Sequence, residues 1–182
     1  MKVIGIVGGP RREGNTARLV EEVLAGAREN GNETHIFYLG DMEINPLQWD
    51  EDGYIYPDDD DFTTIMPHLE SMGSLILGTP IYYDHVSSRT KLFIDRLYYY
   101  SRSHGEEYYL KFPKGVKCVN IIAFGWNNSG AYDKVLDWMN ERMTHYWRME
   151  ILGNLKSYGT GVNPTKENSE LLIKARKIGR KI

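Results

Sequence analysis

The chain has 182 residues, and its hydrophobic content of 41% is enough to bury a core in one domain. Its 22 basic and 25 acidic residues leave a formal net charge of −3, which favours neither nucleic acid nor a membrane as a partner. The single cysteine, Cys118, excludes an internal disulfide, a cysteine-based zinc site and an iron–sulfur cluster built by one chain. We therefore expect a single domain over residues 1–182 with no bound metal.

The first apolar run, Val3–Val7, is too short to be a secretory signal or a membrane span, so we expect a cytoplasmic protein. Further runs rich in β-branched residues alternate with helical patterns, which is typical of parallel strands joined by crossover helices. This pattern predicts an α/β fold with a doubly wound, five-stranded parallel sheet in the flavodoxin-like strand order 2-1-3-4-5. The later strands are expected at Thr34–Leu39, Ser74–Thr79, Val116–Phe124 and Glu150–Tyr158, and the later helices at Asp61–Met72, Ser87–Tyr100, Ala131–Trp147 and Glu167–Lys181.

A glycine-rich turn, Gly8–Thr16, follows the first strand and leads into a helix whose apolar face includes Val20 and Leu24. Free N–H groups at a helix start favour an anion, and arginine, amide and hydroxyl side chains in the turn can donate to the same group. The turn lacks the Walker sequence and the Gly-x-Gly-x-x-Gly spacing. It indicates a monophosphate site, although an ordinary strand-to-helix turn is the alternative.

Two more loops leave the same edge of the expected sheet. The loop Thr79–Ser88 follows the third strand, and Gly125–Gly130 follows the fourth. In such sheets ligands lie beyond the carboxyl ends of the strands, where the strand order reverses. Tyr82 and Tyr83 offer flat faces to a planar aromatic ligand, while Trp126 could stack on that ligand, cover one edge of it or contact a partner subunit.

At these loops the chain resembles the NADPH-dependent FMN reductase and iron–sulfur flavoprotein group of the flavodoxin-like superfamily. The similarity runs from Met1 to about Asp133, with its most specific parts at Gly9–Thr16 and Thr79–Leu97. It implies that the first loop holds the FMN phosphate, that the second contacts the isoalloxazine and that the third closes its other side. The cofactor-binding residues are then Gly9, Pro10, Arg11, Gly14, Asn15, Thr16, Pro80, Ile81, Tyr82, Tyr83, Asp84, Gly125, Trp126 and Asn127.

The chain departs from this pattern at two places. Gly9 stands where the family often has serine, so one hydroxyl donor to the phosphate is missing. The segment Asn45–Gly53 contains no cysteine where the iron–sulfur flavoproteins carry a compact cysteine motif. We therefore expect an external electron acceptor, and we interpret the long segment Gly40–Asp60 as a lid or a dimer contact. Trp49, Tyr54 and Tyr56 would carry such a contact.

Several side chains have simpler interpretations. We expect Lys91 and Arg96 to be helix surface charges, Asp58–Asp61 to be a solvated loop before a helix, and Cys118 to be a buried strand residue. The tyrosines at 98–100 and 108–109 are more aromatic surface than one small core readily absorbs, which favours a homo-oligomer, either a dimer or a tetramer. No acid–base or nucleophilic group is assigned a catalytic role.

The resemblance implies an enzyme that transfers hydride from NADPH or NADH to FMN and passes electrons to a quinone, flavin or similar small acceptor. A non-enzymatic electron carrier between redox proteins is the alternative, and a binding protein with a vestigial crevice is a third possibility.

Overall fold

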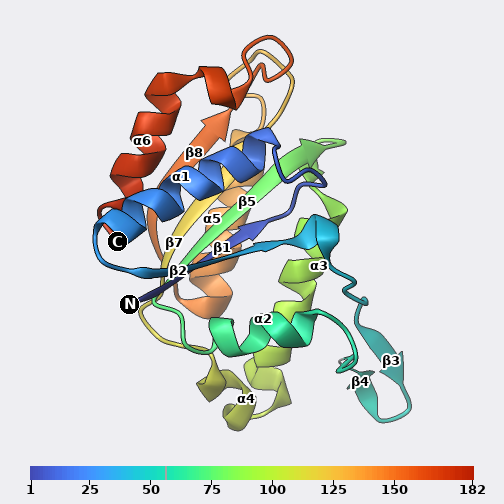
Figure 1. Cartoon of the computed structure of the whole chain (residues 1–182). Helices are drawn as coiled ribbons and strands as arrows, with labels where there is room; N and C mark the ends of the chain where they lie inside the picture. Colours follow the sequence, from blue (N-terminus) through green and yellow to red (C-terminus); the bar gives the residue numbers. More distant parts are fainter. Residues whose placement is uncertain (56) are drawn as a thin grey trace.

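A parallel sheet forms the centre of the computed structural model, which describes residues 1–55 and 57–182 (Figure 1). Its strands lie in the order β2-β1-β5-β7-β8, which confirms the predicted order 2-1-3-4-5. In register, Val3 of β1 is opposite Thr34 on one side and Ser74 on the other. The strands are β1 (Lys2–Val7), β2 (Glu33–Tyr38), β5 (Ser74–Tyr82), β7 (Lys117–Ala123) and β8 (Glu150–Ser157).

Helices cover both faces of this sheet (Figure 1). Because side chains alternate along a strand, Ile4 and Ile6 join the core cluster on one face, while Val3 and Val7 join the cluster on the other. The first face is covered by α2 (Phe62–Leu69), α3 (Ser88–Arg96) and α5 (Asp133–Trp147), and the second by α1 (Asn15–Glu29) and α6 (Ser169–Gly179).

Helices α1 and α6 approach each other closely through glycine. A Cβ added to Gly26 would lie 2.1 Å from the carbonyl oxygen of Arg176, and one added to Gly179 would lie 2.0 Å from that of Val23. Side chains at these two positions would push the helices apart, so glycine permits this packing. Salt bridges from Arg176 to Glu22 and from Arg180 to Glu29 join the same two helices.

The segment after β2 contains a hairpin that the sequence did not predict. After a 3₁₀ turn at Leu39–Asp41, strands β3 (Gln48–Asp50) and β4 (Gly53–Ile55) pair antiparallel in a hairpin that projects from the body of the molecule (Figure 1). We call residues 45–55 the arm. Tyr56, expected with Trp49 and Tyr54 to serve a lid or a dimer contact, lies outside the described residues. Other short elements are β6 (His85–Val86), α4 (Glu106–Lys111) and 3₁₀ turns at Leu97–Tyr100, Arg102–His104 and Thr165–Glu167.

Two expectations about surface charge need correction. The expectation for Arg96 is wrong, because this side chain is buried with only 1% of the residue exposed, and it forms an ion pair with Asp60. Asp60 is buried as well, so the run Asp58–Asp61 is not wholly a solvated loop. Lys91 is exposed and pairs with Asp95 one helical turn away, as a surface charge should.

The clustered tyrosines are largely absorbed by the fold. Tyr100 is buried beside Phe112, and Tyr98, Tyr99 and Tyr108 are half-buried. Cys118 is fully buried in β7, as expected. Within residues 1–55 and 57–182, none of the helices combines the length and apolarity that crossing a bilayer requires.

Candidate functional site

A crevice opens at the carboxyl ends of the strands, between the loops that follow β1, β5 and β7. The predicted site residues line it except for Tyr83, Asp84, Trp126 and Asn127, and three residues not predicted join them. The lining consists of Gly9, Pro10, Arg11, Gly14, Asn15, Thr16, Pro80, Ile81, Tyr82, Ala123, Phe124, Gly125 and Thr160.

The start of α1 forms the polar end of the crevice. Gly14 is its N-cap, and no side chain among the described residues caps the helix. The first backbone hydrogen bond of the helix runs from the Arg18 N–H to the Gly14 carbonyl, at 3.0 Å. The N–H groups of Asn15, Thr16 and Ala17 therefore have no partner within the helix, and with the helix dipole they fit an anion such as a phosphate.

The loop before α1 is fixed from two sides. The Gly8 N–H donates to the Gly78 carbonyl at 2.8 Å, and the Ser87 hydroxyl donates to the Gly8 carbonyl at 2.7 Å. A Cβ on Gly8 would lie 1.7 Å from the Thr90 hydroxyl oxygen, so only glycine fits this position. The loop is held rigidly against β5 and α3, as an anion site made of backbone N–H groups requires.

Asn15 has a structural partner that the sequence did not reveal. Its side-chain oxygen accepts a hydrogen bond of 2.8 Å from the Thr165 N–H, 150 positions later in the chain. The oxygen is therefore committed to joining α1 to the loop after β8. Only the amide NH₂ group of Asn15 remains to donate to an anion.

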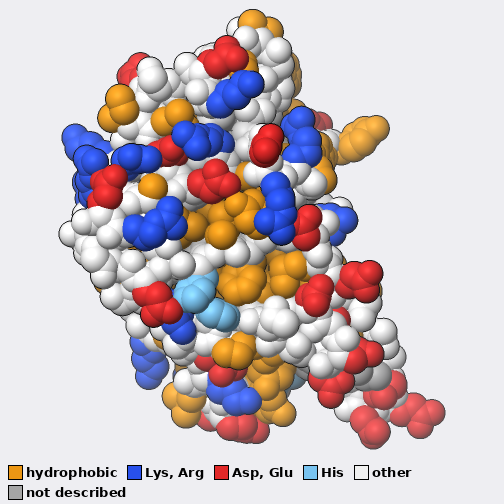
Figure 2. Space-filling view, viewed as in Figure 1, with side chains coloured by type: hydrophobic (Ala, Val, Ile, Leu, Met, Phe, Trp, Pro, Cys, Tyr) orange, Lys and Arg blue, Asp and Glu red, His pale blue; other side chains and the backbone are white. Residues whose placement is uncertain are grey.

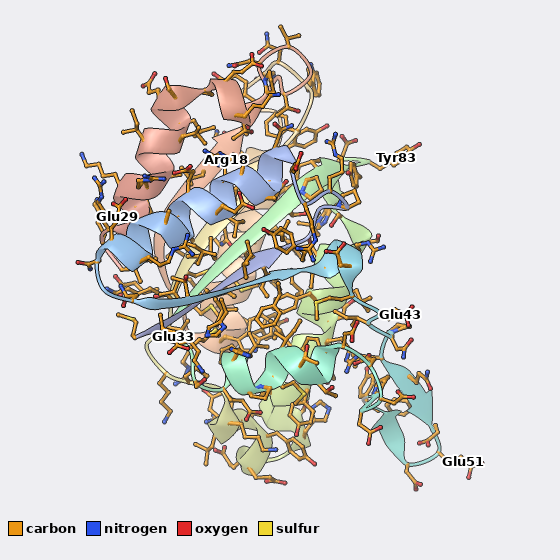
Figure 3. All side chains as sticks on the ribbon, viewed as in Figure 1. Arg18, Glu29, Glu33, Glu43, Glu51 and Tyr83 are labelled. Carbon is orange, nitrogen blue, oxygen red and sulfur yellow. The ribbon has the colours of Figure 1, made fainter. Side chains whose placement is uncertain are left out.

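The second loop turns sharply after Tyr82. Tyr82 pairs with His85 in the β5–β6 hairpin, and Tyr83 and Asp84 between them have φ of 46° and 63°. Two consecutive left-handed residues are the geometry of a type I′ hairpin turn. Tyr83 is fully exposed and points away from the body (Figure 3), so it does not line the crevice.

A hydrogen bond joins the second loop to the segment before α5. The Tyr132 hydroxyl donates to a carboxylate oxygen of Asp84 at 2.8 Å, and this bond, followed by burial, raises the pKa of Tyr132. The Tyr132 ring packs edge-on against Phe124, with 4.9 Å between the centroids. Asp84 thus fixes the rim of the crevice, while the exposed Trp126 lies beyond its lining.

Thr160 comes from a loop that the sequence analysis did not assign to the site. Its N–H donates to the Phe124 carbonyl at 3.2 Å, and the neighbouring Gly159 N–H donates to the Trp126 carbonyl at 3.0 Å. Gly159 has a φ of 61°, which favours glycine. The sequence Gly159-Thr160-Gly161 at the end of a strand was the available signal for this fourth loop.

Comparison with known proteins places the chain in a family. Residues 1–112 match the model of the NADPH-dependent FMN reductase family. The chain belongs to this family. The family is named for NADPH-dependent reduction of FMN, which supports FMN as the cofactor and a reduced nicotinamide as the donor.

Individual relatives agree with this assignment. An iron–sulfur flavoprotein of Methanocaldococcus jannaschii is 42% identical over 100 residues, which are 53% of this chain and 51% of that protein, so the chain matches about half of the relative's length. A Bacillus subtilis protein named as an NAD(P)H-dependent FMN-containing oxidoreductase is 30% identical, with 87% of this chain and 86% of that protein covered. A solved NAD(P)H:quinone oxidoreductase from Methanothermobacter marburgensis shares the fold, with a TM-score of 0.70 and 15% identity over 100% of this chain and 96% of that one.

The lining of the crevice suits FMN better than it suits acid–base or nucleophilic catalysis. Arg11 is the one charged side chain among the described residues that line it, and these include no histidine, cysteine or carboxylate. Uncapped N–H groups and Arg11 lie at one end, and the rings of Pro80, Tyr82 and Phe124 provide apolar surface. Redox chemistry at this crevice must therefore come from a cofactor.

Proposed function

We propose that the protein oxidises NADPH or NADH and reduces a small-molecule acceptor, such as a quinone or a free flavin, using FMN held in the crevice. The observation that carries this proposal is the crevice itself, where the unpartnered N–H groups of α1 meet apolar and aromatic walls. A molecule with a phosphate at one end and a planar ring system at the other matches both parts.

The first loop would hold the phosphate. Arg11 can form a charge-assisted bond to it, and the N–H groups at residues 15–17, the Asn15 amide NH₂ and the Thr16 hydroxyl can donate as well. Gly9, Pro10 and Gly14 supply the close backbone approach.

The second and third loops would hold the ring system. Pro80, Ile81 and Tyr82 of the second loop line the crevice, as do Phe124 and Gly125 after β7. FMN supplies hydride acceptance and electron transfer at this place. Tyr83, Asp84, Trp126 and Asn127 would act at the rim, where an arriving donor or acceptor passes.

An external acceptor agrees with the cysteine content of the chain. Cys118 is the single cysteine and is fully buried, so the chain cannot supply the thiolates that hold an iron–sulfur cluster. The Methanothermobacter marburgensis neighbour is named a quinone oxidoreductase, which supports a quinone as the first acceptor to test. A cytoplasmic location stays a prediction.

The first experiment is a flavin and turnover assay on the purified chain. We expect a flavin absorption spectrum, one FMN per chain after reconstitution, and NADPH or NADH oxidation that depends on added quinone or flavin. A chain that binds no FMN after reconstitution would contradict the proposal. Bound FMN with negligible turnover of both nicotinamides, together with a long-lived half-reduced form, would instead support the electron-carrier alternative.

A further inference from the structure

A second cavity continues the crevice beyond its polar end. Residues that line both cavities include Arg11, Asn15, Gly125 and Thr160. No described residue of the second loop lines the second cavity, so it extends from the phosphate end and away from the ring walls. Its volume is about 670 Å³, which is in the range of cofactor sites. We call this space, between the start of α1 and residues 160–166, the outer pocket.

Cationic side chains line the outer pocket from two parts of the chain. Arg12 and Arg18 come from the first loop and the start of α1, and Lys166 comes from the 3₁₀ turn after β8. Each arginine has a carboxylate partner outside the lining, whereas Lys166 forms no ion pair within residues 1–55 and 57–182. Figure 2 shows Lys and Arg side chains along the face that α1 and α6 form. Two arginines and an unpaired lysine favour an anionic group in this pocket.

The wall that carries Lys166 is fixed to the start of α1. The Asn15 side-chain oxygen accepts the bond of 2.8 Å from the Thr165 N–H, directly before Lys166 in the chain. Thr165 is fully buried, and its hydroxyl lies 2.6 Å from that of Ser157 at the end of β8. The backbone at Lys166 is therefore held in place before a ligand arrives, which lowers the entropy lost on binding.

Two carboxylates in the lining narrow the chemistry of the anion. Glu13 is exposed, and Glu21 accepts a bond of 2.7 Å from the Tyr38 hydroxyl. Carboxylates repel a bare phosphate or sulfate, but they accept hydrogen bonds from the ribose hydroxyls and the amino group of an adenosine. Cations and carboxylates together therefore suit a nucleotide better than an inorganic anion.

We propose that the outer pocket holds the adenosine monophosphate half of FAD, so that the chain binds FAD as well as FMN in one crevice. This inference rests on the proposed function, because it takes the flavin phosphate to lie at the start of α1. In FAD the second phosphate is joined directly to the phosphate that FMN also carries, so it leaves the crevice at that end. There it enters the outer pocket, where Arg12 and Lys166 can bind it. The adenosine of a nicotinamide dinucleotide is not joined to the flavin and has no such constraint.

Calorimetric titration of flavin-free protein with FMN and with FAD tests the pocket directly. We expect the native chain to bind FAD with a dissociation constant within tenfold of that for FMN. Arg12→Ala/Lys166→Ala should raise the dissociation constant for FAD at least tenfold and that for FMN less than threefold, because both removed cations lie in the outer pocket. FMN and FAD carry nearly the same charge at neutral pH, so a general change in the field of the protein affects both alike.

Gly161 allows a second test that removes no cation. It lines the outer pocket, a Cβ added there meets no atom within 4 Å, and its backbone is not in the left-handed region. A side chain can therefore be added without strain. Gly161→Glu places a carboxylate at the pocket wall and should weaken FAD binding at least tenfold with little change for FMN. Gly161→Gln has the same size without the charge and should weaken FAD binding less.

Lys174→Ala/Lys177→Ala is the control for net charge, because it removes two exposed cations of α6 outside the pocket and should leave both affinities unchanged. Circular dichroism checks that each variant is folded. A native chain that binds neither flavin would contradict the proposed function together with this inference. Binding of FMN without FAD, or an FAD affinity indifferent to both pocket variants, would overturn this inference alone. So would an effect of Arg12→Ala/Lys166→Ala confined to the KM for NADPH relative to NADH, since the pocket would then bind the 2′-phosphate of the donor.

Discussion

At the scale of single residues, Gly9 is the clearest case of a position that the structure allows to change. A Cβ added there would lie 3.7 Å from the Pro80 Cδ and 3.9 Å from the Thr16 Cβ, which are ordinary contacts. Its backbone is not in the left-handed region that requires glycine. The glycine is therefore not dictated by the fold, in contrast to Gly8 one position earlier.

We predict that Gly9→Ser strengthens FMN binding. A serine hydroxyl at this point of the phosphate loop can donate to the phosphate, and a hydrogen bond of about 1 kcal/mol lowers the dissociation constant about fivefold. Fluorescence titration with FMN and with riboflavin measures the effect, which should appear for FMN alone. Gly9→Ala is the matched control and should bind both ligands as the native chain does. If Gly9→Ala tightens FMN binding as much as Gly9→Ser, the gain in affinity comes from the backbone, and the proposed bond from the serine hydroxyl is wrong.

We predict that Arg11→Ala weakens FMN binding at least tenfold with little change for riboflavin. The lost interaction is a charge-assisted bond of about 1.5–3 kcal/mol to the phosphate, which riboflavin lacks. Asn15→Asp should likewise weaken FMN binding much more than riboflavin binding, because the carboxylate keeps the bond from the Thr165 N–H but repels the phosphate. Equal losses of affinity for FMN and riboflavin would show that neither residue binds the phosphate.

At the scale of elements, Arg96 connects α3 to the arm and to the start of α2. It is buried, binds carbonyls at residues 45 and 57, and lies 4.5 Å over the ring of Phe62. All three residues of β3 are exposed, so β3 contributes no buried apolar side chain that could hold the arm against the body. The hydrogen bonds from Arg96, whose side chain is held by its ion pair with Asp60, therefore fix where the arm leaves the body.

We predict that Arg96→Met destabilises the protein by about 3–5 kcal/mol, because Asp60 is left buried without its counter-charge. Arg96→Lys should also destabilise, since an ammonium cannot reach the carboxylate and both carbonyls in the same planar arrangement. Urea denaturation of each variant gives the free energy of unfolding. Arg96→Met/Asp60→Asn should recover part of the loss; a double variant as unstable as the sum of the single ones would show that the two residues act independently.

The buried carboxyl group of Asp60 makes the free energy of unfolding depend on pH. Burial raises the pKa of this carboxyl, but hydrogen bonds from Arg96 and the Asn45 N–H and the charge of Arg96 outweigh it, so the pKa is lowered from 3.8. A carboxylate with a lowered pKa contributes stability that is fully present above its unfolded pKa and is lost as the pH falls through the folded value. The free energy of unfolding should therefore fall below about pH 4 in the native chain, and less steeply in Arg96→Met/Asp60→Asn.

The elements that the sequence predicted are those with local signals. Val3–Val7 and Val116–Phe124 are long β-branched runs bounded by loops, and the structure has strands at both places. The hairpin in the arm was not predicted because β3 and β4 have only three residues each. That is too short to show the alternation of apolar and polar residues by which a strand is recognised in a sequence. Burial of Arg96 was missed because its partners lie 36 to 51 positions away in the sequence, and pairing over that distance leaves no local pattern.

At the scale of the whole molecule, the strand order determines where the site lies. β1 and β5 are neighbours although they are far apart in sequence, so the loops after them open side by side at one edge of the sheet. This geometry made most of the crevice predictable from two motifs. Thr160 was not predictable in the same way, because its position depends on how the loop after β8 folds back onto the Phe124 carbonyl.

The whole molecule also determines which redox centre it can carry. Iron–sulfur clusters require several thiolates, and this chain has one cysteine, which lies near the start of β7. Burial raises the pKa of the Cys118 thiol to about 12, so the thiolate is scarce at neutral pH. Within the described residues, no group of three His, Cys, Asp or Glu side chains is arranged to hold a metal ion.

We predict that protein made and purified without oxygen contains FMN but no stoichiometric iron or acid-labile sulfide. A cluster shared between subunits would need Cys118 of several chains at one point, and a residue fully buried inside β7 cannot reach another chain without unfolding the sheet. Iron and sulfide analysis tests the first statement, and titration with a thiol reagent tests the second. Cys118 should react in denaturant and be inert in the native protein. Stoichiometric iron with sulfide, or rapid labelling of the native thiol, would mean that the sheet opens at β7 and that the electron path proposed here is wrong.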